Sequence, residues 1–195
     1  MSSLLEESYQ VPSQNNSSLK DIPPIETFQL RQNINGVETE LLIQTFDDRI
    51  LVIITQNGKV GYLTQASLPP QIPLPPPPKS NSQNENGNSS SLEILKVLPI
   101  PPSSLQLIPL IGTTTNSTLY DLYINQISTL IFYIIEMSSL SRRNVVVGLS
   151  LKKRQLSNND NYNQDEEDES EILNDEERER FAGIMELVSQ WTGPQ

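Results

Sequence analysis

Two Asn-Gly pairs set between strand-like runs constrain the fold of this chain more than any other feature. Asn35-Gly36 precedes the run 37–46, in which apolar and polar residues alternate. Asn57-Gly58 lies between the aliphatic run 50–54 and a further strand-like run, 59–66. Asparagine and glycine tolerate the positive φ that a two-residue type I′ turn requires. The sequence therefore predicts a β-meander over residues 35–66, with Asn57-Gly58 as a hairpin turn.

Other strands are predicted on both sides of this meander. Within the meander, the run 50–54 is continuously aliphatic, which is typical of a central strand covered on both faces. Residues 26–34 and 92–98 give weaker strand signals, and the run 144–151 alternates cleanly after Arg142-Arg143, for which a solvated turn is expected. Gly58 and Gly61 are interpreted as a turn and a close strand approach, because no Gly-Lys-Ser or helix start follows them to form a phosphate loop.

Two helices are predicted in the second half of the chain. Ser117 is expected to cap a helix that runs to about Met137, with apolar residues spaced at three and four. Its longest apolar run, 130–135, is far shorter than the roughly 18 residues that a membrane span needs. A second, amphipathic helix is expected over 175–191. Its buried stripe is expected to comprise Phe181, Ile184, Met185, Val188 and Trp191. Its solvated residues are expected to be Glu176, Glu177, Arg178, Glu179 and Arg180, so that Glu177→Ala would be nearly silent.

The order of these elements predicts one α+β domain. Its largely antiparallel β-sheet begins with the meander and is packed by two helices, one between the late strands and one C-terminal. The domain is expected to span residues 25–192, after a disordered N-terminal tail over 1–24. Flexible inserts are expected at 67–91, which is rich in Pro, Asn and Ser, and at 153–174, which is acidic.

Composition excludes several classes of function. The net charge is −11 and the pI is about 4.4, so nucleic acid and anionic membranes would repel the chain and a basic protein partner is more natural. The 195 residues include no cysteine and no histidine, which removes disulfides, thiol nucleophiles and the usual zinc ligands. No catalytic, cofactor-binding or metal-binding residues are predicted, and the chain is not expected to be an enzyme. The first residues lack the pattern of a signal peptide, so the cytoplasm, or also the nucleus, is the expected location.

The meander also carries an ordered set of motif residues. They are Gly36, Val37, Thr39, Phe46, the run 50–54, Thr55, Gln56, Gly58, Lys59, Gly61 and Leu63. In this order and spacing they resemble the signature of the proteasome assembly chaperone 3 family. The later elements are similar to that family as well: a helix from Leu119, a valine-rich strand that ends in lysine at Lys152, and a terminal helix that closes on Trp191. The resemblance covers most of residues 35–66 and 117–191, and it leaves out both inserts.

This resemblance implies a role without a reaction. Members of the family support formation of the α-subunit ring of the 20S proteasome core particle and leave before it matures. The expected partners are the fourth assembly chaperone in a heterodimer, or a second copy in isolation, together with the α-type subunits. Chaperones of the other pair in this pathway end in a hydrophobic-tyrosine-any residue tail, which this chain lacks, so C-terminal docking is not expected.

Two further classes of function are weighed against the chaperone. In the first, the proline run 73–78 would dock on an SH3, WW or profilin-like partner and make the chain an adaptor, although a semi-rigid spacer is the preferred explanation of the run. In the second, carboxylates would serve a small hydrolase, but no paired acids fall on predicted rigid elements near a nucleophile. The acidic run 165–169 lacks the Asp-x-Asp-x-Asp-Gly order of a calcium loop, and it is interpreted as solvated.

Overall fold

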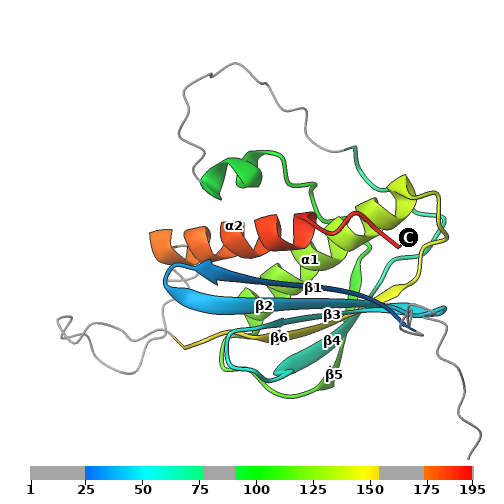
Figure 1. The fold of residues 1–195 in the computed structure, drawn as a ribbon. Coiled ribbons are helices and arrows are strands. Elements are labelled where there is room, and N and C mark those ends of the chain that lie inside the picture. Colours follow the sequence, from blue (N-terminus) through cyan, green and yellow to red (C-terminus); the bar gives the residue numbers. More distant parts are fainter. Residues whose placement is uncertain (1–24, 77–90, 154–173, 195) are drawn as a thin grey trace, which may run out of the picture.

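The structure is a computed structural model that describes residues 25–76, 91–153 and 174–194. It shows a six-stranded sheet with the two α-helices of the described part on one side of it (Figure 1). The predicted α+β class is confirmed, with one helix between late strands and one at the C-terminus. The predictions for the tail 1–24, the acidic run 165–169 and most of both inserts lie outside the described residues.

The sheet is mixed, with a single parallel pair. Its spatial order is β1-β2-β3-β6-β4-β5, and only β3 and β6 run parallel to each other. The strands are β1 (Glu26–Ile34), β2 (Val37–Thr45), β3 (Arg49–Thr55), β4 (Tyr62–Ser67), β5 (Gln106–Ile111) and β6 (Asn144–Ser150).

The first Asn-Gly pair forms the turn that its sequence predicts. Ile34 at the end of β1 pairs with Val37 at the start of β2, so Asn35 and Gly36 make a two-residue turn. Both turn residues have positive φ, 50° and 79° respectively. A type I′ turn requires this combination, and its twist matches that of the strands on either side.

The second Asn-Gly pair does not form a hairpin, and that prediction is wrong. β3 and β4 follow each other in the sequence, but β6 lies between them and pairs with both. Gly58 keeps a positive φ of 63° in the connecting loop. The predicted close approach at Gly61 is confirmed, because a Cβ built there would lie 2.2 Å from the carbonyl oxygen of Leu149 in β6.

The segment between β4 and the first α-helix also differs from prediction. Residues 92–98 form no strand: a 3-10 helix, η1 (Ser91–Lys96), occupies this position and packs against the C-terminal helix. Ile94 and Leu98 turn toward the core, an arrangement that the i+4 spacing of a helical turn permits. The edge strand β5 was not predicted, because Pro109 in its middle reads as a strand breaker.

The helices α1 (Ser117–Met137) and α2 (Asp175–Ser189) cover one face of the sheet. The cap of α1 is Asn116 rather than Ser117, since Asn116 Oδ1 accepts a hydrogen bond from the amide of Leu119 at 3.0 Å. In α2, Ile184, Met185 and Val188 are buried as predicted. Trp191 is also buried, just beyond the end of the helix. Neither of these helices is long and apolar enough to cross a membrane.

Candidate functional site

The two faces of the sheet differ sharply in how they are covered. Side chains of β2 and β3 alternate between the faces, and those on the helix side, such as Leu41, Ile43 and Val52, are almost completely buried. Their neighbours on the opposite side, Leu42 and Ile53, are only half-buried. In the described part of the chain, no helix lies over this second side (Figure 1).

Strand register gathers apolar residues from five strands on this uncovered side. One row across the sheet consists of Leu42, Ile53, Gly148, Leu63 and Ile111, each paired with the next. The adjacent row consists of Gln44, Leu51, Val146, Gln65 and Ile108. We call the exposed and half-buried apolar members of these rows the open face: Leu42, Leu51, Ile53, Leu63, Ile108 and Ile111; Val146, in the middle of the second row, is buried. None of its residues is charged.

The open face continues to the edge of the sheet at β5. Ile108 and Ile111 are 48% and 68% exposed, and β5 contains no charged residue. Natural edge strands are usually protected by charges, proline or a bulge, and β5 has only Pro109 and a register shift opposite Leu63 and Thr64. Contiguous exposed apolar residues on a folded domain are typical of interaction sites, which makes the open face the candidate site.

A polar rim borders the open face at the opposite edge of the sheet. Arg31 of β1 forms ion pairs with Glu38 and Glu40 of β2, and all three side chains are substantially exposed. The combination of an apolar centre with a charged rim is the usual anatomy of a protein–protein interface.

The open face corrects the prediction for the run 50–54. Its central position in the sheet is confirmed, because β3 is paired on both sides, with β2 and β6. The expectation that it would be covered on both faces is wrong for the described residues, since Leu51 and Ile53 are only half-buried. The aliphatic run did not reveal that the described part of the chain covers one face of the strand only partly.

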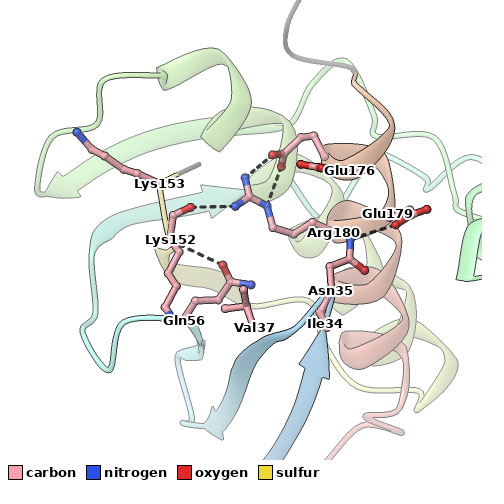
Figure 2. A pocket seen from close by; sticks show the side chains of 10 residues that line it. Ile34, Asn35, Val37, Gln56, Lys152, Lys153, Glu176, Glu179 and Arg180 are labelled. Carbon is pink, nitrogen blue, oxygen red and sulfur yellow. Dashed lines mark hydrogen bonds and ion pairs between the residues drawn. The ribbon is translucent and has the colours of Figure 1, made fainter. Parts of the chain in front are cut away.

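Three motif residues meet at the ends of β2, β3 and β6. Gln56 Nε2 donates to Thr39 Oγ1 at 3.0 Å, and the backbone amide of Lys152 donates to Gln56 Oε1 at 3.1 Å. The amide of Gln56 also donates to the carbonyl of Ser150 at 2.8 Å. The buried Gln56 side chain therefore joins strands that are distant in sequence, which gives the motif a structural role (Figure 2).

A buried ion pair links the same corner to both helices, and it contradicts the expectation for α2. Glu177 is 6% exposed and forms an ion pair with Arg180, whose side chain is 16% exposed. The hydroxyl of Tyr123 in α1 donates to Glu177 Oε1 at 2.6 Å, and Arg180 Nη1 donates to the carbonyl of Lys152 at 3.0 Å. Burial and the Glu177 carboxylate raise the pKa of Tyr123, so its hydroxyl remains a donor. The prediction that Glu177 and Arg180 lie in water is wrong.

The pocket around this corner contains charges of both signs. Its volume is about 540 Å³, and it is lined by Lys152, Lys153 and Arg180 together with Glu176, Glu177 and Glu179 (Figure 2). Asn35 from the β1–β2 turn donates to Glu179 at 3.2 Å across it. Such a mixture favours neither an anion nor a cation. Among the described residues, no group of three acidic side chains is arranged to hold a metal ion.

The predicted solvated turn at Arg142-Arg143 is also wrong. The Arg142 side chain is 5% exposed, and Arg143 Nη1 donates to the carbonyl of Phe46 at 2.7 Å. This burial was not predicted, because carbonyl acceptors such as that of Phe46 are remote in the chain.

Comparisons with known proteins do not decide the family. No family model matches the chain, and a search of the curated proteins finds no significant match. The resemblance to the proteasome assembly chaperone 3 family therefore rests on the motif residues alone.

Proposed function

We propose that this chain is a non-catalytic assembly chaperone of the 20S proteasome core particle. In this role it supports formation of the α-ring together with a partner chaperone, in the cytoplasm or nucleus, and leaves before maturation. The observation that carries the proposal is the open face, which is an uncharged sheet surface suited to a second protein. The ordered motif residues support the assignment to proteasome assembly. The apolar surface supports an action by binding another protein.

The size of the open face suits a stable partnership. The outer side of the whole six-stranded sheet, with strands about 4.8 Å apart and about 20 Å long, presents roughly 600 Å² of projected area, and the open face is its apolar part. A stable complex buries about 800 Å² of accessible surface per partner. Because side chains add to the projected area, a second sheet packed on the open face would reach this range. The occupant that fits best is therefore the apolar sheet of a related chaperone, or of a second copy.

The chemistry of the buried cluster of Tyr123, Glu177 and Arg180 favours binding over catalysis. Glu177 and Arg180 neutralise each other, and the hydroxyl of Tyr123 is engaged by Glu177. The chain has no histidine or cysteine to act as a base or nucleophile near neutral pH. A role in assembly requires none of these groups.

The open face can be tested without disturbing the fold. Ile108→Lys combined with Ile111→Lys places two charges on side chains that are already exposed in the single chain. We expect this variant to be monomeric by analytical ultracentrifugation at micromolar concentration, whereas the parent is dimeric or requires its partner chaperone. Ile100→Lys is the matched control, since Ile100 is 70% exposed and lies in the segment after η1.

The cellular function needs a separate measurement. Cells that lack the protein should accumulate incomplete or misassembled α-rings on native gels. The parent and Ile100→Lys should restore normal core particles, and the open-face double variant should not. Unchanged assembly intermediates in cells that lack the protein and any paralogue would contradict the proposal.

A further inference from the structure

Arg142 is a buried arginine whose donors point at a proline-rich segment. Its Nη1 atom donates to the carbonyl of Pro69 at 2.7 Å and to the carbonyl of Ile72 at 2.9 Å. Its Nη2 atom forms an ion pair with Glu136 near the C-terminal end of α1. The guanidinium also lies over the ring of Phe132, 5.9 Å from its centroid. One side chain thus joins the segment after β4 to α1.

Residues 69–76, which we call the strap, begin with a turn and then lie against the core. The amide of Ile72 donates to the carbonyl of Pro69 at 3.1 Å, which closes the turn. Ile72 and Leu74 are half-buried and pack on the core, whereas Pro73 and Pro76 are exposed. The strap follows β4 and passes beside the C-terminal end of α1 (Figure 1).

The composition of the strap explains why an arginine is needed there. Proline contributes a carbonyl acceptor but no backbone donor, so a proline-rich turn has more acceptors than donors. Arginine supplies several donors in a fixed geometry and no acceptor, and its bonds are charge-assisted. Arg142 therefore adds a second bond to the Pro69 carbonyl, which already accepts from the Ile72 amide, and supplies a donor for the Ile72 carbonyl.

We propose that Arg142 fastens residues 69–76 as a strap, which closes the core beside α1. The fastened strap turns Leu74 toward the core and leaves Pro73 and Pro76 exposed. Detachment of the strap from Arg142 exposes Leu74 to solvent.

The absence of cysteine from the chain allows a direct test. Single cysteines are introduced as Leu74→Cys, Pro76→Cys and Val52→Cys, and the rate of reaction with a thiol reagent is measured for each. Leu74→Cys should react at least tenfold more slowly than Pro76→Cys in the same segment. Adding Arg142→Gln should speed the reaction at Leu74→Cys by roughly tenfold or more, the effect expected from losing charge-assisted hydrogen bonds.

The variant Val52→Cys distinguishes local detachment of the strap from a general loss of stability. Val52→Cys reports opening of the whole domain, because Val52 is fully buried in the central strand. The proposal expects Arg142→Gln to change this rate much less than the rate at Leu74→Cys, and Arg49→Gln at an exposed arginine to change neither. Equal reaction of Leu74→Cys and Pro76→Cys in the parent would overturn the proposal. An equal acceleration at Leu74→Cys and Val52→Cys would overturn the specific role of Arg142.

Discussion

Replacing Glu177 by alanine is expected to destabilise the domain strongly. The change removes the acceptor of the buried Tyr123 hydroxyl and the ion-pair partner of Arg180. A buried polar group left without a partner costs about 1–3 kcal/mol, and removing one partner of a buried ion pair costs about 3–5 kcal/mol. Arg180 keeps its bond to the Lys152 carbonyl and retains some contact with water, which places the loss at the lower end, about 3 kcal/mol.

Thermal and chemical unfolding measure this loss. For a chain of this length, about 3 kcal/mol lowers Tm by roughly 6–12 °C. Glu177→Gln keeps a hydrogen-bond acceptor and should lose less than Glu177→Ala. Glu186→Ala is the matched control, because Glu186 lies on the same helix with an exposed side chain and should change stability by no more than about 0.5 kcal/mol. Equal unfolding midpoints for Glu177→Ala and Glu186→Ala in urea would show that the interactions of Glu177 with Tyr123 and Arg180 contribute nothing to the free energy of unfolding.

Three further substitutions test the packing of the fold by urea unfolding. Trp191→Ala should cost about 3–5 kcal/mol, and Ile184→Asp should cost more because it buries an unpaired carboxylate. A loss below about 1 kcal/mol for either variant would refute the burial of these side chains against the core. Gly61→Ala should cost about 2–5 kcal/mol, since its φ is 70° and the new methyl group would meet the backbone of β6. An unchanged stability would exclude the close approach of Gly61 to β6. Gln56→Ala should cost about 1–3 kcal/mol, because Thr39 in β2 and the backbone amide of Lys152 just after β6 lose a partner. An unchanged unfolding midpoint would show that water replaces the Gln56 amide.

Several parts of the fold that local sequence determines were predicted correctly. The alternation in β2 and the turn at Asn35-Gly36 depend only on neighbouring residues, and the structure reproduces both. The apolar stripe of α2 was predicted from its spacing for the same reason. Periodicity and turn chemistry report on the chain within a few residues of a given position.

The errors arise where distant segments meet. The exclusion of β4 from a hairpin with β3 depends on β6, which lies about a hundred residues further along the chain. The Glu-rich start of α2 was interpreted as solvated because Tyr123, the partner that buries Glu177, belongs to another helix. Local pattern carries no information on such long-range contacts.

The open face was not predicted as a unit, although its elements were present in the sequence. Leu51 and Ile53 were expected to be covered, and β5 was missed because of Pro109. Only the register across the strands shows that Ile53, Leu63 and Ile111 form one row. The uncharged sequence of β5 was the one available signal, since an edge strand without charges is unusual.

The placement of β6 between β3 and β4 has a consequence for synthesis on the ribosome. Once residue 67 has emerged, β3 and β4 are joined by Asn57-Gly58, a pair that favours a hairpin, while residues 144–150 do not yet exist. Pairing between these two strands forms in microseconds, far faster than translation adds the missing residues. An isolated two-stranded hairpin is only marginally stable in water, so any β3–β4 pairing on the nascent chain gives way when β6 inserts, and the last strand of the described part completes the middle of the sheet.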